Sequence, residues 1–256
     1  MPFVASGKEK LFYSLSRAAA APLTLVCLHG SGGRHTHWPE GLRASRRVRT
    51  AAVDLPGHGR SSGAGRSRVE DYADDIAGMI QALGLASVAL MGHSLGGAIV
   101  QVLALRRPAW LKKIVLVGTG ARLRVAPAIL EKLLQEPSRA ADLLGDWSLG
   151  PTASPALRTA VCEGFRQTPP EVTHGDFSAC DRFDIMAHLS EIGLPALVVS
   201  GAEDRLTPPK YGDFLARHMS DARHVILPRA GHMLALEFPA EFTRLVEGFL
   251  ADVENG

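Results

Sequence analysis

The sequence predicts an α/β protein with a mostly parallel central sheet, flanked by helices and interrupted by a helical insertion. Three observations carry this prediction. Short apolar runs in the first half end at glycine or proline, a helical pattern lies between two of them, and strand character returns late in the chain after a helical stretch. Strands that alternate with helices along a chain build parallel sheets with helices on their faces.

Short apolar segments in the first half of the chain are the first predicted strands. They are rich in β-branched and aliphatic side chains and lack polar alternation, which is typical of strands buried on both faces of a sheet. Each ends at a glycine, a proline or a polar loop. The segments cover residues 23–28, 48–53, 87–91 and 113–117.

Helical patterns accompany these strands. Apolar residues recur at helical spacing from Val69 to Leu83, between two of the strands. Ser67 and Glu70 stand three apart at the start of this segment, which is the spacing of a capping box. A second helix is predicted over residues 97–105, and the chain closes with an amphipathic helix over residues 241–250.

The pattern changes after residue 120. Residues 121–188 carry helical apolar patterns and several prolines but no convincing strand, whereas strand character returns at 194–200 and 223–227. The late strands need a sheet to join. We therefore expect one core domain, residues 1–120 and 189–256, with a helical insertion at 121–188. Two independent domains are the alternative.

The composition is that of a folded protein without a strong net charge. Apolar residues make up 46% and charged residues 21%, and 28 Lys and Arg face 26 acidic residues. This balance excludes strong long-range attraction to nucleic acid or anionic lipid. The three cysteines show no C-x-x-C spacing, and neither a secretory segment nor a membrane-spanning run is visible. We expect a cytoplasmic monomer or homodimer with no nucleic-acid or membrane partner.

Two segments match the pattern G-x-S-x-G, which indicates a serine nucleophile only in the right structural context. Ser94, in residues 92–96, directly follows a predicted buried strand and precedes a predicted helix. Such a turn raises the hydroxyl above the sheet edge and aims backbone N–H groups beside it. Ser61, in residues 59–63, lies between a proline-glycine loop and further glycines, so a surface turn is predicted there.

A serine hydroxyl needs a base to take its proton, and the base itself must be oriented. His232 is the predicted base, because it lies in a loop between the last predicted strand and the final helix. His218 and His224 lie in a predicted surface helix and a strand, where structural roles are expected. Asp204 directly follows a late strand and is the predicted carboxylate partner, with Glu203 as the alternative.

The order Ser94, Asp204, His232, together with the His-Gly loop at residues 29–33 and the segment 54–59, resembles the α/β-hydrolase fold of capped serine hydrolases. The resemblance covers nearly the whole chain. It implies a Ser-His-Asp catalytic triad and makes residues 121–188 a helical cap. It is less specific for substrate, because esterases, lactonases, thioesterases and carbon–carbon bond hydrolases share these elements.

The same resemblance implies an oxyanion hole, the pair of N–H groups that binds the developing negative charge. One N–H in the family comes from the residue after the nucleophile, here Leu95. The other comes from the loop after the His-Gly pair, here Ser31, with Gly32 as the alternative. This loop reads Gly-Ser-Gly-Gly rather than the longer His-Gly-Gly-Gly of some lipases, which argues against bulky tertiary-alcohol esters.

The expected activity is cofactor-free hydrolysis of a carboxylic ester or related acyl compound through an acyl-enzyme intermediate. A small-molecule substrate with a small or medium apolar acyl group is the default expectation. Apolar residues of the insertion are candidates for the pocket wall: Leu123, Ile129, Leu133, Leu143, Trp147, Phe165, Phe177 and Phe183.

Two alternatives remain open. The first is a carbon–carbon bond hydrolase or lactonase with the same triad and a cation for a substrate carboxylate, supplied by Arg122, Arg124 or Arg182. The second is a ligand-binding or signalling protein of the same fold that turns over slowly. A pre-steady-state burst followed by turnover would exclude the second.

Other polar groups do not indicate a metal or cofactor. Residues 35–37, His-Thr-His, lack an acid at the spacing of a binuclear metal site and are interpreted as surface or pocket rim. Asp74 and Asp75 are interpreted as the solvated face of a helix. Residues 30–33 lack the Gly-Lys-Ser/Thr ending of a phosphate-binding loop. No metal and no cofactor are therefore implied.

Overall fold

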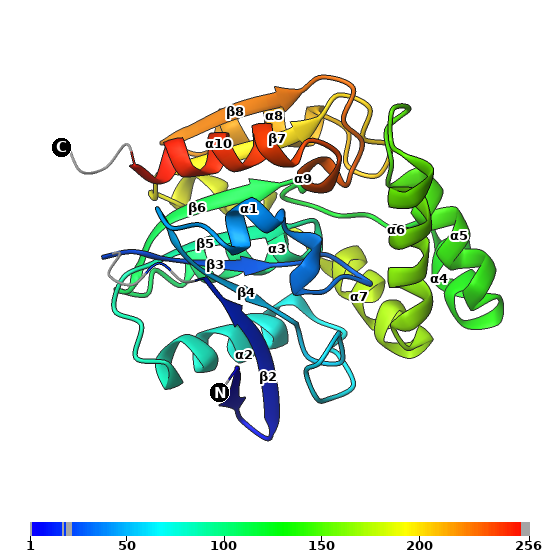
Figure 1. Cartoon of the computed structure of the whole chain (residues 1–256), viewed down its shortest axis with the longest axis horizontal. Coiled ribbons are helices and arrows are strands. Elements are labelled where there is room, and N and C mark those ends of the chain that lie inside the picture. Colours follow the sequence, from blue (N-terminus) through cyan, green and yellow to red (C-terminus); the bar gives the residue numbers. More distant parts are fainter. Residues whose placement is uncertain (1, 17, 19–21, 252–256) are drawn as a thin grey trace.

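A single mixed sheet organises the computed structural model, which describes residues 2–16, 18 and 22–251. Its strand order is β1-β2-β4-β3-β5-β6-β7-β8 (Figure 1). Neighbours from β4 to β8 in this order run parallel, whereas β1 and β2 pair antiparallel at one edge. The predicted α/β fold with a mostly parallel sheet is therefore confirmed.

All six predicted strands are present, and an N-terminal hairpin adds two that the sequence did not reveal. The hairpin strands carry exposed and charged positions, so they lack the continuous apolar signal of the buried strands. The strands are β1 Phe3–Ser6, β2 Glu9–Leu15, β3 Thr24–Leu28, β4 Arg49–Val53, β5 Val88–His93, β6 Leu111–Val117, β7 Ala196–Gly201 and β8 Ala222–Leu227.

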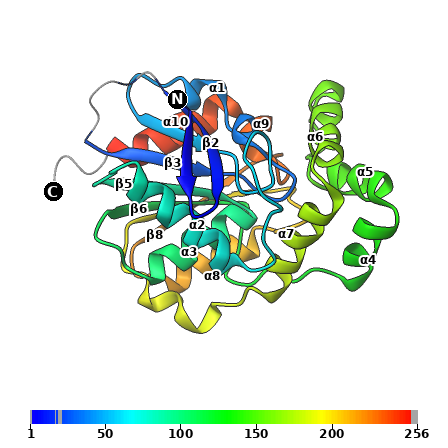
Figure 2. The same cartoon turned by 90° about the horizontal axis from the view of Figure 1, so that it is seen from below.

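Helices cover both faces of the sheet (Figures 1 and 2). Helices α2, α3 and α8 pack on one face, and α1 and α10 on the other. The helices are α1 Glu40–Arg43, α2 Val69–Ala82, α3 Leu95–Leu105, α4 Pro127–Gln135, α5 Pro137–Trp147, α6 Pro155–Gln167, α7 Pro170–Arg182, α8 Lys210–His218, α9 Leu234–Glu237 and α10 Pro239–Ala251, with 3₁₀ turns at His35–His37 and Met186–Glu191.

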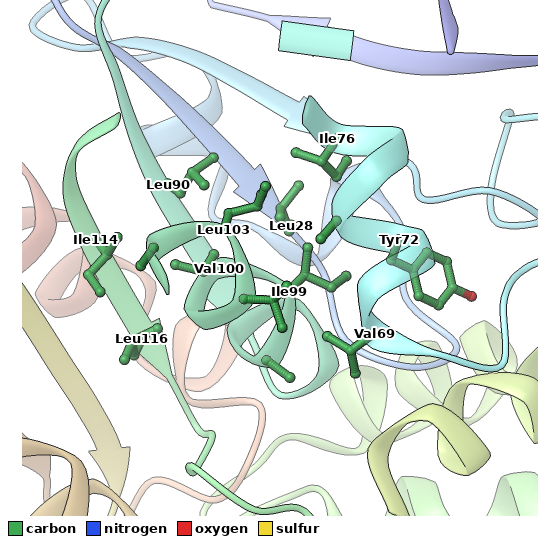
Figure 3. Close-up of a cluster of buried hydrophobic side chains, with 14 of the residues drawn as sticks. Leu28, Val69, Tyr72, Ile76, Leu90, Ile99, Val100, Leu103, Ile114 and Leu116 are labelled. Carbon is green, nitrogen blue, oxygen red and sulfur yellow. The ribbon is translucent and has the colours of Figure 1, made fainter. Parts of the chain in front are cut away.

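Buried strands send alternate side chains to two apolar clusters. Leu28 of β3 packs in the cluster shared with α2 and α3, and its neighbour Cys27 packs in the cluster shared with α1 and α10. Figure 3 shows part of the first cluster, which includes Leu28 and Leu90 of the strands and Ile99 and Leu103 of α3. Apolar side chains on both faces explain why these strands read as continuous apolar runs in the sequence.

The start of α2 differs from the prediction. Its N-cap residue is Arg68, whose side chain makes no capping hydrogen bond. The prediction of a capping box formed by Ser67 and Glu70 is therefore wrong. The preceding loop is held instead by Arg66, whose backbone N–H donates to the Tyr72 hydroxyl at 2.9 Å. This contact links the loop directly to the first turns of the helix.

The interpretation of the two aspartates on α2 is correct for Asp74 and wrong for Asp75. Asp75 is buried, and the Arg66 guanidinium lies 2.9 Å from its carboxylate. Ser6 at the end of β1 donates to the Asp75 backbone carbonyl at 2.8 Å. The unpredicted hairpin thus covers the helix face that the sequence pattern assigned to solvent.

Helices α4 to α7 form an insertion between β6 and β7 and gather at one side of the molecule (Figures 1 and 2). A single β-bridge between Arg122 and Asp184 holds the two ends of this α4–α7 insertion together. Strand β7 then pairs with β6, so the late strands extend the same sheet. Among the helices in the described residues, none is long and apolar enough to cross a membrane.

Candidate active site

Ser94 lies at a strained turn between β5 and α3. Its backbone angles are φ 52° and ψ −115°, a left-handed conformation that costs a non-glycine residue about 1–3 kcal/mol. A Cβ atom at Gly92 would lie 2.1 Å from the Gly96 carbonyl oxygen, and one at Gly96 would lie 2.2 Å from the Leu28 carbonyl oxygen. The flanking glycines are therefore required for strand, turn and helix to meet this closely.

Neighbouring strands hold the backbone of this turn. The Ser94 N–H donates to the Val117 carbonyl at 2.9 Å, at the end of β6. The Ser94 carbonyl accepts a hydrogen bond from the Thr119 hydroxyl at 2.8 Å. Contacts of this kind offset local strain and keep the serine at the carboxyl edge of the sheet.

Asp204 and His232 form a buried pair at the same edge. Asp204 follows β7, His232 follows β8, and the His232 Nδ1 atom donates to Asp204 Oδ2 at 2.8 Å. Both residues are buried. Because Nδ1 carries the proton in this bond, Nε2 of the neutral imidazole is left free to accept one.

Asp204 is oriented by its own loop. The backbone N–H groups of Leu206 and Thr207 each donate to Asp204 Oδ1 at 2.9 Å, and the Thr207 hydroxyl donates to Oδ2 at 2.9 Å. Burial alone would raise the pKa of Asp204, but His232 and these hydrogen bonds hold that pKa below its ordinary value. Thr207 was not predicted as a site residue, although the Asp-x-x-Thr spacing, which is typical of a side-chain turn, is a signal in the sequence.

A cavity of about 200 Å³ connects these groups with the α4–α7 insertion. Ser94, His232, Thr207 and Ser31 all line it. Within the described residues, no direct hydrogen bond joins the Ser94 hydroxyl to His232. The structure thus brings the two predicted residues into one cavity and brings Asp204 and His232 into contact.

The apolar wall of the cavity comes mainly from the insertion. Leu144 and Val161 line it although the sequence analysis had not singled them out. Leu133 and Phe183 instead pack in apolar clusters, and Leu143 is also absent from the wall. Five of the predicted residues do line the cavity: Leu123, Ile129, Trp147, Phe165 and Phe177.

Two further histidines line the cavity. His93 Nε2 donates to the backbone carbonyl of His232 at 3.0 Å, which supports the loop that carries the predicted base. Burial lowers the pKa of His93 well below its ordinary value and lowers the pKa of His37 to about 4. Both imidazoles are therefore neutral at physiological pH.

The His-Thr-His segment divides between two roles. His35 Nδ1 donates to the buried carboxylate of Asp54 at 2.9 Å, whereas His37 lines the cavity. In the part of the chain that the structure describes, no three His, Cys, Asp or Glu side chains are grouped to hold a metal ion. The segment thus belongs to the loop framework and to the cavity wall.

The predicted oxyanion donors occupy two different positions. Leu95 is the first residue of α3, where a helix leaves its backbone N–H groups without an internal acceptor. Its side chain is buried and does not line the cavity. Ser31 lines the cavity directly. Gly32, the alternative, has φ 65°, and a Cβ atom there would lie 2.4 Å from the Phe165 ring.

The second G-x-S-x-G serine is part of a loop framework. The Ser61 hydroxyl donates to the Asp54 carbonyl at 2.6 Å and accepts from the Phe12 N–H at 2.8 Å. It does not line the cavity. Glu203, the alternative carboxylate, is exposed, and His224 hydrogen-bonds Asp213 rather than a cavity residue.

Of the three arginines predicted as candidates for binding a substrate carboxylate, one lines the cavity and two do not. Arg124 lines the cavity. Arg122 pairs with Asp184 outside it, and Arg182 donates to a backbone carbonyl at Ser67. Arg205, which the sequence analysis did not select, lines the cavity as well.

A buried charged network ties the insertion to α2 and to the loop after β4. Asp176 of α7 accepts a hydrogen bond from His58 Nε2 at 2.9 Å and one from the Tyr72 hydroxyl at 2.5 Å. His58 Nδ1 faces the Pro56 carbonyl at 3.0 Å, so both ring nitrogens face acceptors, as suits a protonated imidazole. Burial opposes this charge, but Asp176 attracts it, and the pKa of His58 is raised.

A second network joins the insertion to the loop of His232. The Glu237 carboxylate accepts hydrogen bonds from Gly231 N–H at 3.0 Å and from Gly150 N–H at 2.9 Å. Gly231 immediately precedes His232, and Gly150 follows α5. The position of the predicted base is therefore coupled to the insertion through one carboxylate.

A mostly parallel sheet with a serine at a strained strand-to-helix turn and an Asp–His pair at the same edge is typical of the α/β hydrolase class of proteins. A model of the Alpha/beta hydrolase family matches residues 25–245. The chain belongs to this family.

Curated relatives of the chain have several activities. It is 32% identical to the dihydrolipoyllysine-residue acetyltransferase component of the acetoin cleaving system of Pseudomonas putida, over 95% of this chain and 67% of that one. It is 29% identical to pimeloyl-[acyl-carrier protein] methyl ester esterase of Neisseria meningitidis, over 79% of this chain and 83% of that one. It is also 29% identical to 2-hydroxymuconate semialdehyde hydrolase of Pseudomonas putida, over 90% of this chain and 87% of that one.

Solved structures agree with this placement. A thermophilic esterase superposes with a TM-score of 0.86 at 35% identity and covers 98% of this chain and 97% of its own. The enol-lactonase from Burkholderia xenovorans LB400 superposes with a TM-score of 0.89 at 27% identity, covering 97% and 99%. Esterases, a lactonase and a semialdehyde hydrolase are thus among the proteins to which this chain is similar.

Proposed function

We propose that the chain is a serine hydrolase that cleaves a carboxylic ester or related small acyl compound through an acyl-enzyme intermediate. The hydrogen bond from His232 Nδ1 to Asp204, beside a cavity that Ser94 also lines, carries this proposal. It leaves Nε2 of His232 available as a base on the cavity side. The match to the Alpha/beta hydrolase family and the esterases among its relatives support it.

The proposed first step is attack on the ester carbonyl. The Ser94 hydroxyl oxygen bonds to the carbonyl carbon while its proton moves to His232 Nε2. The contact between these groups is expected to form when substrate binds, since catalytic hydrogen bonds tighten in the complex. Asp204 holds the imidazole in this tautomer and stabilises its positive charge.

The proposed oxyanion donors are the backbone N–H groups of Leu95 and Ser31. An N–H group at a helix start is pre-oriented toward negative charge, which favours Leu95. When the tetrahedral intermediate collapses, His232 gives its proton to the departing alcohol and Ser94 is left acylated. Water then attacks the acyl group, its proton passes to His232, and return of that proton to Ser94 releases the acid.

The two parts of the chain are proposed to have different roles. We propose that residues 1–120 and 189–256 form the catalytic core domain and that residues 121–188 form a helical cap over the site. Ser94, Asp204 and His232 lie in loops of the core, whereas Leu123, Ile129 and other apolar wall residues lie in the cap. The cap would then select the acyl group while the core performs the reaction.

A lactone or carbon–carbon bond substrate is the second candidate. The similarity to the enol-lactonase and to 2-hydroxymuconate semialdehyde hydrolase favours it, because those proteins share this fold. The same serine, histidine and aspartate would act on either carbonyl. Comparison of neutral esters, thioesters, lactones and carboxylate-bearing substrates separates the candidates.

The decisive experiment removes the nucleophile. Ser94→Ala is expected to lower kcat for the preferred ester on the order of 10⁶-fold, as loss of the nucleophile does in serine-triad enzymes. Ser61→Ala, in the other G-x-S-x-G segment, is the matched control and is expected to retain turnover. Near-normal hydrolysis by Ser94→Ala, measured as product release against enzyme-free buffer, would remove the assignment.

A further inference from the structure

Permanently charged side chains on the cavity wall share one sign. Among the described residues that line the cavity, these are Arg124 and Arg205, and none is Asp or Glu. The other titratable wall residues include His37 and His93, which burial keeps neutral. A cavity whose fixed charges are cationic favours an anionic ligand over a neutral one of the same shape.

The two arginines differ in what they already bind. The Arg124 guanidinium lies 3.9 Å from the Asp181 carboxylate and donates to the Asp181 backbone carbonyl at 3.5 Å. In the described part of the chain, the Arg205 side chain has neither a hydrogen-bond acceptor nor an ion-pair partner. Its guanidinium lies over the Trp147 ring, 5.9 Å from the centroid. Arg205 therefore has a charge and donors that no protein group neutralises.

Its place in the fold puts the Arg205 side chain at the cavity. Arg205 follows Asp204 in the loop after β7, and Trp147 ends α5 of the insertion. Both residues line the cavity, so the pair bridges its core side and its insertion side. An aromatic ring holds a guanidinium through the ring face and leaves N–H groups for the two oxygens of a carboxylate.

We propose that Arg205 binds a carboxylate on the substrate while the scissile carbonyl lies at Ser94, so that the enzyme selects anionic acyl compounds such as dicarboxylate half-esters. This inference rests on the proposed hydrolase function. The cavity of about 200 Å³ suits a short chain. By comparison with benzene in a cavity of about 150 Å³, it holds roughly eight non-hydrogen atoms, the size of a glutaryl group.

Two esters of equal chain length test the proposal. Monomethyl glutarate carries a carboxylate at the position where methyl pentanoate carries a methyl group. The quantity compared is kcat/KM for the half-ester divided by kcat/KM for the neutral ester. We expect this ratio to be on the order of tenfold lower in Arg205→Gln than in the wild type, because the variant loses one charge-assisted contact. Added salt is expected to lower the wild-type ratio in the same direction.

Matched variants identify the residue. Arg124→Gln removes the other wall cation, whose charge Asp181 already balances, and is expected to keep the wild-type ratio. Arg205→Lys keeps a charge but loses the planar fork, so its ratio should lie between wild type and Arg205→Gln. An unchanged ratio in Arg205→Gln, or an equal loss in Arg124→Gln, would overturn the proposal.

A binding measurement separates this proposal from the proposed function. Calorimetry of monomethyl glutarate with Ser94→Ala, alone and combined with Arg205→Gln, reports the anion site without turnover. Weaker binding in the double variant would support the site even if wild type cleaves neither ester. Cleavage of both esters with a ratio independent of Arg205 would leave the hydrolase assignment intact and remove the anion site.

Discussion

The sheet and the α4–α7 insertion are built on different principles. Strand residues of the sheet pack between two large apolar clusters with helices on both sides. The insertion has its own small cluster, around Leu133, Ala140 and Leu144, and several ion pairs at its surface, such as Arg139 with Glu136. Ser94, Asp204 and His232 come from the first region, and most apolar wall residues come from the second.

Under the proposed function, the groups that react and the residues that contact the acyl group are therefore held by different parts of the structure. The proposed catalytic groups are held by strand ends and by backbone hydrogen bonds, which tolerate little movement. The insertion is joined to the core by apolar contacts, such as those of Ala179 and Phe183, and by the buried polar contacts of Asp176 and Glu237. Changes in the sheet loops should therefore affect turnover, whereas changes at the buried contacts of the insertion should affect stability.

After Ser94→Ala, the largest expected effect is that of a substitution at Asp204, which lies in a loop of the sheet. Asp204→Asn should lower kcat about 10⁴-fold, because the amide no longer holds His232 in the tautomer with a free Nε2, as in serine-triad enzymes. Steady-state ester hydrolysis measures it. Glu203→Gln, at the exposed neighbouring carboxylate, is the control and should retain activity. A severe loss in Glu203→Gln with a mild one in Asp204→Asn would exchange the two assignments.

A smaller effect tests the attachment of the insertion. Asp176→Asn leaves the buried His58 without its counter-charge, which should lower the free energy of unfolding by about 3–5 kcal/mol. Urea unfolding measures the change. Asp146→Asn removes an exposed ion pair with Arg158 on the same insertion and should cost at most about 1 kcal/mol. Equal costs would show that the Asp176 network does not anchor the insertion.

The smallest effect is a pH dependence from the same network. Asp176 raises the pKa of His58 in the folded protein, so its stabilisation is complete below the unfolded value near 6.5 and is lost as pH rises through the raised pKa. The difference in unfolding free energy between wild type and His58→Gln should therefore shrink from pH 6 toward alkaline pH. His218→Gln, on the exposed face of α8, should show no such trend; a constant difference for His58→Gln would contradict the charge assignment.

Much of the sheet could be predicted from the sequence because both faces of its strands are buried. The segment around Val26 reads as an unbroken apolar run, and that signal needs no knowledge of the partner strand. The β1–β2 hairpin lacks it: Glu9 and Lys10 interrupt the pattern because this edge faces solvent on part of its surface. Edge strands owe their position to pairing, which local periodicity does not encode.

The site was predictable where local context marks it. Ser94 stands between strand and helix, and Asp204 and His232 each follow a strand, so their positions along the chain place them at one edge. Thr207 had a local signal in its spacing from Asp204, whereas the proposed role of Arg205 depends on its contact with Trp147, which only tertiary folding creates. The prediction that Asp75 faces solvent was wrong because the side chain of Ser6, in a strand of the unpredicted hairpin, contacts Asp75.

The β-bridge between Arg122 and Asp184 makes the excursion of the chain between β6 and β7 a closed loop. A segment that leaves and returns at one point imposes no stretch on the strands beside it, and lengthening it costs only a slowly growing closure entropy. Such a segment can change in length or helix content while β6 and β7 keep their register, provided that the contacts of Asp176 and Glu237 with the rest of the chain are kept. The bridge thus marks a point at which residues can be added to or removed from the insertion without changing the pairing of β6 with β7.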